Sequence, residues 1–162
     1  MPPRLDNEIR VSQSVLDRLI DYDPRQSQEA PKSRLVSLRD LRQAVRRDLE
    51  WLLNTRCHTV ALDQGLEESK KSVAFFGLPE LLGFSPKNAG DQKLLVKALE
   101  TAIKTFEPRF IDLKVTHEPF DNVDRQMKFK IEARLDIEPT PEPIVFDTVI
   151  EVGSGEFAIT ER

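Results

Sequence analysis

The sequence predicts an α+β fold in which N-terminal helices pack on a small antiparallel β-sheet formed by the C-terminal half of the chain. In residues 37–55 and 91–106, apolar side chains recur at steps of three and four, which is the spacing of one helix face. From residue 111 onward they recur at every second position, the spacing of one strand face. Because the helical patterns come first and the strand patterns follow, helices on one antiparallel sheet are favoured over an alternating α/β arrangement.

The chain has 162 residues, enough for one domain with a hydrophobic core. We expect residues 1–36 to form a helix and an exposed linker, and residues 37–162 to form the main domain. The first helix is predicted from Ile9 to Tyr22, since Pro24 disfavours helix in the residue before it. Its apolar face consists of Val11, Val15, Leu16, Leu19 and Ile20. Residues 25–33 lack large apolar side chains and are interpreted as the linker.

The clearest helix is SLRDLRQAVRRDLEWLLNT, which begins at Ser37. Ser37 and Asp40 have the spacing of a capping box, so the helix is predicted to start there. We expect Trp51 in the core, near the buried face formed by Leu38, Leu41, Val45, Leu49 and Leu52. Arginines at 39, 42, 46 and 47 lie largely off this face. They form either a solvated face or, with Arg42 and Arg46 as candidates, a docking face for an acidic partner.

A second long helix is predicted from Asp91, as its N-terminal cap, to Phe106. Its apolar stripe is formed by Leu95, Ala98, Leu99, Ala102, Ile103 and Phe106. Pro108 prevents the helix from continuing. Between the two helices, residues 73–84 contain glycines and Pro79, and we expect turns there that cover the core.

The C-terminal half predicts three strands and a short fourth strand or tail. Apolar and polar residues alternate over 111–116, 127–138 and 144–152, which is typical of strands that cover a core on one side. Residues 120–125 are the expected hairpin loop, and residues 156–160 the fourth strand or tail. The segment PTPEP, residues 139–143, is expected to interrupt pairing because proline lacks the ladder donor. We also hypothesise that it keeps one sheet edge from pairing wrongly.

Composition argues against several classes of function. The 24 basic and 28 acidic side chains give a net charge of −4, which disfavours general nucleic-acid binding. The chain has one cysteine, Cys57, which fits a reducing, cytoplasmic compartment. No apolar run follows the opening Met-Pro-Pro-Arg, so we expect no signal peptide, and no stretch has the length of a membrane span. Cys57 and His58 are adjacent, but only His117 could join them, so we expect no metal site and no cofactor.

The junction between the second long helix and the first strand carries the sequence Glu107-Pro108-Arg109. Pro108 fixes its own backbone and pushes Glu107 towards an extended conformation, so Arg109 projects from a stiff turn. An arginine there presents a planar fork that suits a carboxylate or backbone carbonyls. The residues leave two interpretations open: a local ion pair of little energetic value, or a docking site.

Four stretches in this order resemble a known family: SVLDRLID, SLRDLRQAVRRDLEWLLNTR, GLPELLG and FEPRF. The last is similar to the Glu-Pro-Arg motif of the phage baseplate wedge and sheath-initiator family, once labelled lysozyme-like. The first three resemble its bacterial branch, the TssE proteins of type VI secretion systems. The resemblance runs from about Ser14 to the C-terminus.

The resemblance implies a protein that docks in the baseplate wedge with TssF, TssG and TssK, in the cytoplasm at the inner-membrane complex. It implies that Glu107, Pro108 and Arg109 contact the helical core bundle of the wedge. It also implies that the last strands pair with the first sheath ring of TssB and TssC. The sheath-facing candidates are Ile144, Phe146, Ile150 and Phe157. On this basis Arg109→Ala is expected to weaken wedge binding and to spare the fold.

The old family label also suggests a cell-wall glycoside hydrolase, which would need two carboxylates around the scissile bond. Glu107 is the only acid in a conspicuous position, and Arg109 would pair with it, which is the wrong setting for a general acid. We therefore predict that the chain is not an enzyme and has no catalytic residues. A cytoplasmic adaptor unrelated to secretion fits the composition, but it leaves the ordered resemblance of four stretches unexplained.

Overall fold

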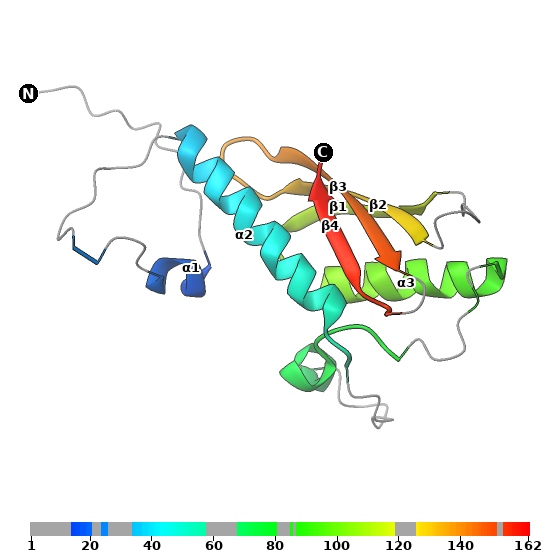
Figure 1. The fold of residues 1–162 in the computed structure, drawn as a ribbon. Coiled ribbons are helices and arrows are strands. Elements are labelled where there is room, and N and C mark those ends of the chain that lie inside the picture. Colours follow the sequence, from blue (N-terminus) through cyan, green and yellow to red (C-terminus); the bar gives the residue numbers. More distant parts are fainter. Residues whose placement is uncertain are drawn as a thin grey trace, which may run out of the picture.

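A computed structural model describes residues 14–20, 24–25, 34–57, 68–80, 85, 87–118, 126–151 and 154–162. In these residues, two long helices lie against one face of a four-stranded antiparallel sheet (Figure 1). The elements in chain order are α1 (Val15–Leu19), α2 (Arg34–Asn54), η1 (Glu68–Lys71), η2 (Val73–Phe75), α3 (Ala89–Phe106), β1 (Phe110–His117), β2 (Gln126–Leu135), β3 (Glu142–Glu151) and β4 (Phe157–Glu161). The predicted α+β class is confirmed.

The sheet has the strand order β1-β2-β3-β4, so β1 and β4 are its two edges. The β2–β3 ladder is continuous from Gln126 opposite Glu151 to Leu135 opposite Glu142. The β1–β2 ladder shifts register between Ile111 and Lys114, and Asp112 within this bulge has a φ of 53°. Aspartate adopts this left-handed conformation more readily than most residues, which explains why a bulge is tolerated there.

The core lies between the two layers and follows the predicted periodicities. Alternate residues of the three later strands are buried: Met127, Phe129, Ile131, Ala133, Leu135, Ile144, Phe146, Thr148, Ile150, Phe157 and Ile159. They face the buried stripes of the helices, formed by Leu41, Val45, Leu49, Leu52 and Leu53 of α2 and Leu95, Leu99, Ala102 and Ile103 of α3. Helix α2 packs against β4, and α3 packs against β1.

The helices begin at other residues than predicted. Helix α2 starts at Arg34, so Ser37 lies inside its first turn rather than at its cap. The cap of α3 is Asn88, whose side chain accepts a hydrogen bond of 2.8 Å from the Gly90 amide. Asp91, the predicted cap, instead accepts a hydrogen bond from the Ser85 amide. Several residues near each start have cap chemistry, and sequence spacing did not distinguish them.

Helix α1 is shorter than predicted. It covers Val15–Leu19, and Ile20 leaves the helix with extended backbone. The remainder of the predicted 9–22 helix, most of the predicted 25–33 linker and the 120–125 loop lie largely outside the described residues. Val15 and Leu19 of α1 are exposed by 72% and 76%, so its apolar face does not enter the core.

Trp51 is another correction, because it is 53% exposed rather than part of the core. It lies on the flank of α2, where the Arg47 guanidinium stacks over its ring at 5.1 Å. Such a stack allows an aromatic ring to remain at the surface.

The PTPEP segment interrupts pairing over only part of its length. The β2–β3 loop contains Pro139 and Pro141, but Pro143 lies in β3 opposite Arg134. The carbonyl of Val145 accepts a hydrogen bond from the Arg162 amide and so points towards β4. Backbone groups two residues apart in a strand point to the same side, so the Pro143 nitrogen also points to the β4 side. Because β4 has ended there, no ladder donor is required of Pro143.

The connection between the long helices returns to the end of α2. The Leu78 amide donates to the Thr55 carbonyl, and the Cys57 amide donates to the Leu78 carbonyl, both at 2.9 Å. Gly77 beside them has a φ of 115°, and a Cβ there would lie 2.4 Å from the Thr55 oxygen. Glycine is therefore required at this turn. Among the described residues, no helix has the length and apolarity to cross a membrane.

Candidate docking site at the α3–β1 corner

The corner between α3 and β1 is built from Glu107, Pro108 and Arg109. Helix α3 ends at Phe106, and the Glu107 amide still donates to the Ile103 carbonyl at 2.8 Å. The Glu107 carbonyl then accepts from the Phe110 amide at 3.2 Å, which closes the turn into β1. The Arg109 carbonyl accepts from the Asp136 amide at 2.8 Å and ties the corner to the end of β2. A turn is therefore present where the sequence predicted one.

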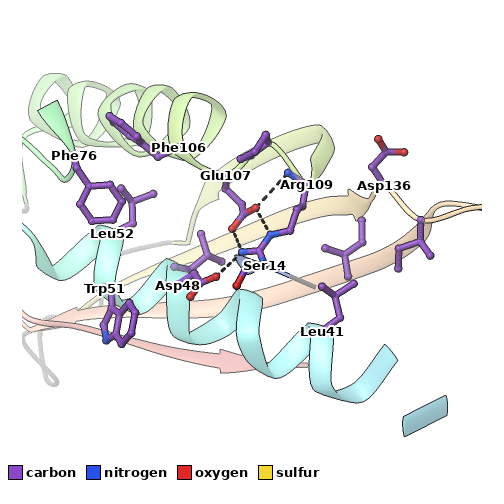
Figure 2. Close-up of a pocket in the computed structure, with 14 residues that line it drawn as sticks. Ser14, Leu41, Asp48, Trp51, Leu52, Phe76, Phe106, Glu107, Arg109 and Asp136 are labelled. Carbon is purple, nitrogen blue, oxygen red and sulfur yellow. Dashed lines mark hydrogen bonds and ion pairs between the residues drawn. The ribbon is translucent and has the colours of Figure 1, made fainter. Parts of the chain in front are cut away.

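Glu107 is buried, with 4% of its surface exposed, and its carboxylate is held by Arg109. One carboxylate oxygen accepts from the Arg109 side-chain Nε at 2.6 Å and from its backbone amide at 3.2 Å. The other oxygen contacts Nη2 of the same guanidinium (Figure 2). The ion pair foreseen as one interpretation therefore exists, but it is not an exposed pair, because its acid lies inside the protein.

The same guanidinium reaches α2, a helix far away in the sequence. Arg109 Nη2 donates to Asp48 Oδ2 at 2.7 Å, as Figure 2 shows. Burial opposes the charge of the Arg109 guanidinium, but the hydrogen bonds and negative charges of Glu107 and Asp48 outweigh this effect and raise its pKa. Arg109 thus stays charged and joins the corner to the helix layer.

A second arginine extends the network to α1. Arg47 donates to Asp48 Oδ1 at 2.7 Å through Nη2 and forms an ion pair with Asp17 Oδ1 at 2.8 Å. The Asp17 carboxylate in turn accepts a hydrogen bond from the hydroxyl of Ser14, the N-terminal cap of α1. Burial acts to raise the pKa of the Asp17 carboxyl, but the Ser14 hydrogen bond and the Arg47 charge outweigh it and lower the pKa. These polar contacts hold α1 beside the corner.

An apolar groove of about 530 Å³ opens beside the corner. Figure 2 shows Trp51 and Leu52 from α2, Phe76 from the connection and Phe106 from α3 around it. Pro108 is exposed and lines the groove together with Leu41, Leu49, Leu135 and Ile137, while the polar part of the lining comes from Ser14, Asp48, Glu107, Arg109 and Asp136. A concave apolar surface with a few fixed polar groups suits the binding of an apolar protein element.

Two of the predicted functional arginines have different environments. Arg42 spans α2 and the sheet, with ion pairs of 3.2 Å to Glu142 of β3 and Glu161 of β4. Its charge is used inside the molecule rather than offered to an acidic partner. Arg46 is exposed, and in the described part of the chain it forms no ion pair.

The four predicted sheath-facing residues do not face outward. Ile144, Phe146 and Ile150 are buried on β3, which is paired with β2 on one side and β4 on the other. Phe157 is buried on β4, whose outer edge is unpaired. Their side chains build the core, so of β3 and β4 only the backbone of β4 has an edge that is not paired with another strand. The alternation that predicted the strands could not reveal their order in the sheet.

The expectation that Arg109→Ala spares the fold rested on the premise that an arginine at a helix end does not support the core, but here the guanidinium pairs with a buried carboxylate. Loss of the guanidinium would leave the buried Glu107 carboxylate without its partner. Sequence reasoning also missed Asp48, which had no local signal because it lies 61 residues from Arg109. Among the described residues, no group of three or more histidine, cysteine or acidic side chains is placed to hold a metal ion.

The chain belongs to the family of baseplate wedge protein gp25, whose model matches residues 39–140, more than half of the sequence. The match includes most of α2, all of α3, the Glu107-Pro108-Arg109 corner, β1 and β2, and it ends before β3. A search of curated proteins found no match to the chain. The family is a structural component of phage-tail-like baseplates, and this is the role that the match supports.

Proposed function

We propose that this protein is a baseplate component of a type VI secretion system that docks in the wedge and initiates the contractile sheath. Family membership supports the baseplate role. The stretches SVLDRLID, SLRDLRQAVRRDLEWLLNTR and GLPELLG support the type VI branch by their resemblance to TssE proteins. The expected location is the cytoplasm, where the baseplate docks at the inner-membrane complex.

The groove at the α3–β1 corner is the proposed attachment to the wedge formed by TssF, TssG and TssK. The observation that carries this proposal is an exposed Trp51 at the edge of an apolar groove whose polar wall is fixed by Arg109. Tryptophans in such positions often dominate binding energies.

Trp51→Ala tests the attachment, because Trp51 is exposed and its loss leaves the core intact. We expect the variant to bind a purified TssF–TssG wedge roughly 30-fold more weakly, equivalent to about 2 kcal/mol for a hot-spot tryptophan. Binding is measured by titration, and folding by circular dichroism. The matched control is Leu94→Ala, which removes an exposed apolar side chain of α3 that does not line the groove. Equal binding by both variants would place the attachment elsewhere.

The proposed sheath contact is pairing of a TssB–TssC strand with the open edge of β4. An edge strand offers unpaired backbone groups that template an added strand. Strand β4 satisfies this requirement, because it is paired on one side only. A sheath strand placed there would extend the four-stranded sheet without disturbing the core.

A catalytic role has no support at the corner. Glu107 and Asp48 both accept hydrogen bonds from the Arg109 guanidinium, so neither is free to protonate a leaving group. We therefore propose a purely architectural function, without cofactor. An adaptor unrelated to secretion would leave the match to the wedge family without explanation.

A further inference from the structure

The outer edge of β4 is not uniformly open, because Asn54 occupies one end of it. The Phe157 amide donates to Asn54 Oδ1 at 2.8 Å, and Asn54 Nδ2 donates to the Phe157 carbonyl at 2.9 Å. A side-chain amide has the same donor and acceptor as a peptide group. Asn54, the last residue of α2, therefore takes the place that one residue of a neighbouring strand would fill.

The ladder shows which backbone groups of β4 point outward. The Arg162 amide donates to the Val145 carbonyl, and the Glu151 amide donates to the Glu156 carbonyl, so even-numbered residues here face β3. Because hydrogen bonding alternates along an antiparallel strand, residues 157, 159 and 161 face away from β3. Asn54 satisfies the first of these three, which leaves the amides and carbonyls of Ile159 and Glu161 as the open positions.

We propose that Asn54 sets the register in which a partner strand adds to β4. By closing the edge at Phe157, it confines pairing to Ile159 and Glu161 and so fixes where the added strand ends. This inference rests on the proposed sheath function, because it concerns the strand-pairing edge. It adds a specificity-determining residue from α2, outside the sheet, to that edge.

The Asn54 side chain also protects the free protein against unwanted strand pairing at the edge of β4. A long open edge invites pairing with other copies or other chains, and natural sheets shorten or cover such edges. Asn54 reduces the outward positions of β4 from three to two. The Asn54 side chain is exposed, so packing in the core does not fix its position. Its two hydrogen bonds to the Phe157 backbone do.

Amide hydrogen exchange by NMR on the full chain tests the proposal. In the free wild type, the Phe157 amide should exchange at least about tenfold more slowly than the amides of Ile159 and Glu161. Asn54→Ala should remove this protection, and Asn54→Asp should weaken it, because the carboxylate can accept from the Phe157 amide but cannot donate to the Phe157 carbonyl. The matched control is Gln43→Ala, which removes another exposed amide from α2. Unchanged exchange at Phe157 in Asn54→Ala would overturn the proposal.

The same measurement with added TssB–TssC complex separates this inference from the sheath function. For the wild type we expect protection to appear at Ile159 and Glu161, with the Asn54 side-chain amide signals unchanged. In Asn54→Ala, protection should extend to Phe157. Two results would overturn the register proposal. One is release of the Asn54 side-chain amide from Phe157 when the complex binds. The other is an Asn54→Ala variant in which the Ile159 amide becomes protected from exchange but the Phe157 amide does not. If Ile159 gains no protection, the sheath function fails, and the free-chain comparison alone decides whether Asn54 closes the edge.

Discussion

Arg109 illustrates how a single residue can serve the fold and the site together. Its guanidinium neutralises the buried Glu107 and reaches Asp48 on α2, so two layers of the structure depend on it. A charge left alone in the interior is costly, and removing one partner of a buried ion pair typically destabilises a protein strongly. The corner is therefore first a structural device, and the fixed geometry of its side chains suits the proposed docking role.

We predict that Arg109→Ala lowers the free energy of unfolding by about 3 kcal/mol, the lower end of the range for broken buried ion pairs. Urea denaturation followed by circular dichroism measures the change. The control is Arg46→Ala, which removes an exposed arginine without an ion pair and should change stability by less than about 0.5 kcal/mol. If Arg109→Ala were no more destabilising than Arg46→Ala, the guanidinium would not be supporting Glu107.

Thr148 presents the opposite case, a polar group in the core that gains nothing there. It lies on β3 between Phe146 and Ile150, is fully buried, and its Oγ1 has no hydrogen-bond partner. We predict that Thr148→Val stabilises the protein by about 1 kcal/mol, because the change removes an unsatisfied hydroxyl at nearly constant shape. Thermal unfolding measures it, with the exposed Thr160→Val of β4 as the control. A lower melting temperature for Thr148→Val would show that the hydroxyl has a partner.

For the individual helices and strands, the spacing of apolar residues predicted which face of each strand is buried. Alternation over residues 127–135 and 144–150 placed the buried faces of β2 and β3 correctly, because a strand face repeats every second residue. Helix starts were less accurate, since Asn88 and Asp91 both have cap chemistry and only the tertiary structure selects one. The Asp112 bulge had no separate signal within an otherwise regular strand pattern.

Contacts between distant elements could not be predicted from spacing. Asp48 meets Arg109 across 61 residues, and Asn54 meets Phe157 across 103 residues. The order of strands in the sheet could not be predicted from spacing either. It is this order that leaves an edge of β4, rather than of β3, unpaired. The sequence thus predicted the motif at the corner, whereas the groove and the edge position depend on how the layers pack.

At the scale of the whole molecule, α2 links the two proposed interaction surfaces. Trp51 and Leu52 of α2 line the corner groove, and Asn54 of the same helix holds the edge of β4. Arg42, nearer the start of α2, pairs with Glu142 and Glu161 and fixes the helix to the sheet. A partner in the groove and a strand on the edge would therefore be held by one rigid helix.

Separating the two surfaces requires a change that spares the core. Deletion of β4 would not do so, because Phe157 and Ile159 are buried at 3% and 4% exposure. Glu161→Pro is better suited, because the residue is not part of the core and its amide points away from β3. Proline is tolerated on an edge strand where the missing donor faces outward.

We predict that Glu161→Pro reduces sheath initiation on assembled baseplates several-fold while wedge binding stays at the wild-type level. The physical reason is that proline removes one of the two open amide donors of β4 and places a ring where an added strand would lie. Sheath initiation is measured by counting TssB–TssC sheaths in electron micrographs, and wedge binding by titration.

Glu161→Ala is the matched control, because it loses the ion pair with Arg42 but keeps the backbone donor. If both variants lost sheath initiation equally, the Arg42 contact rather than strand pairing would carry the effect. If Glu161→Pro initiated sheaths as well as the wild type, β4 would not be the edge at which the sheath begins.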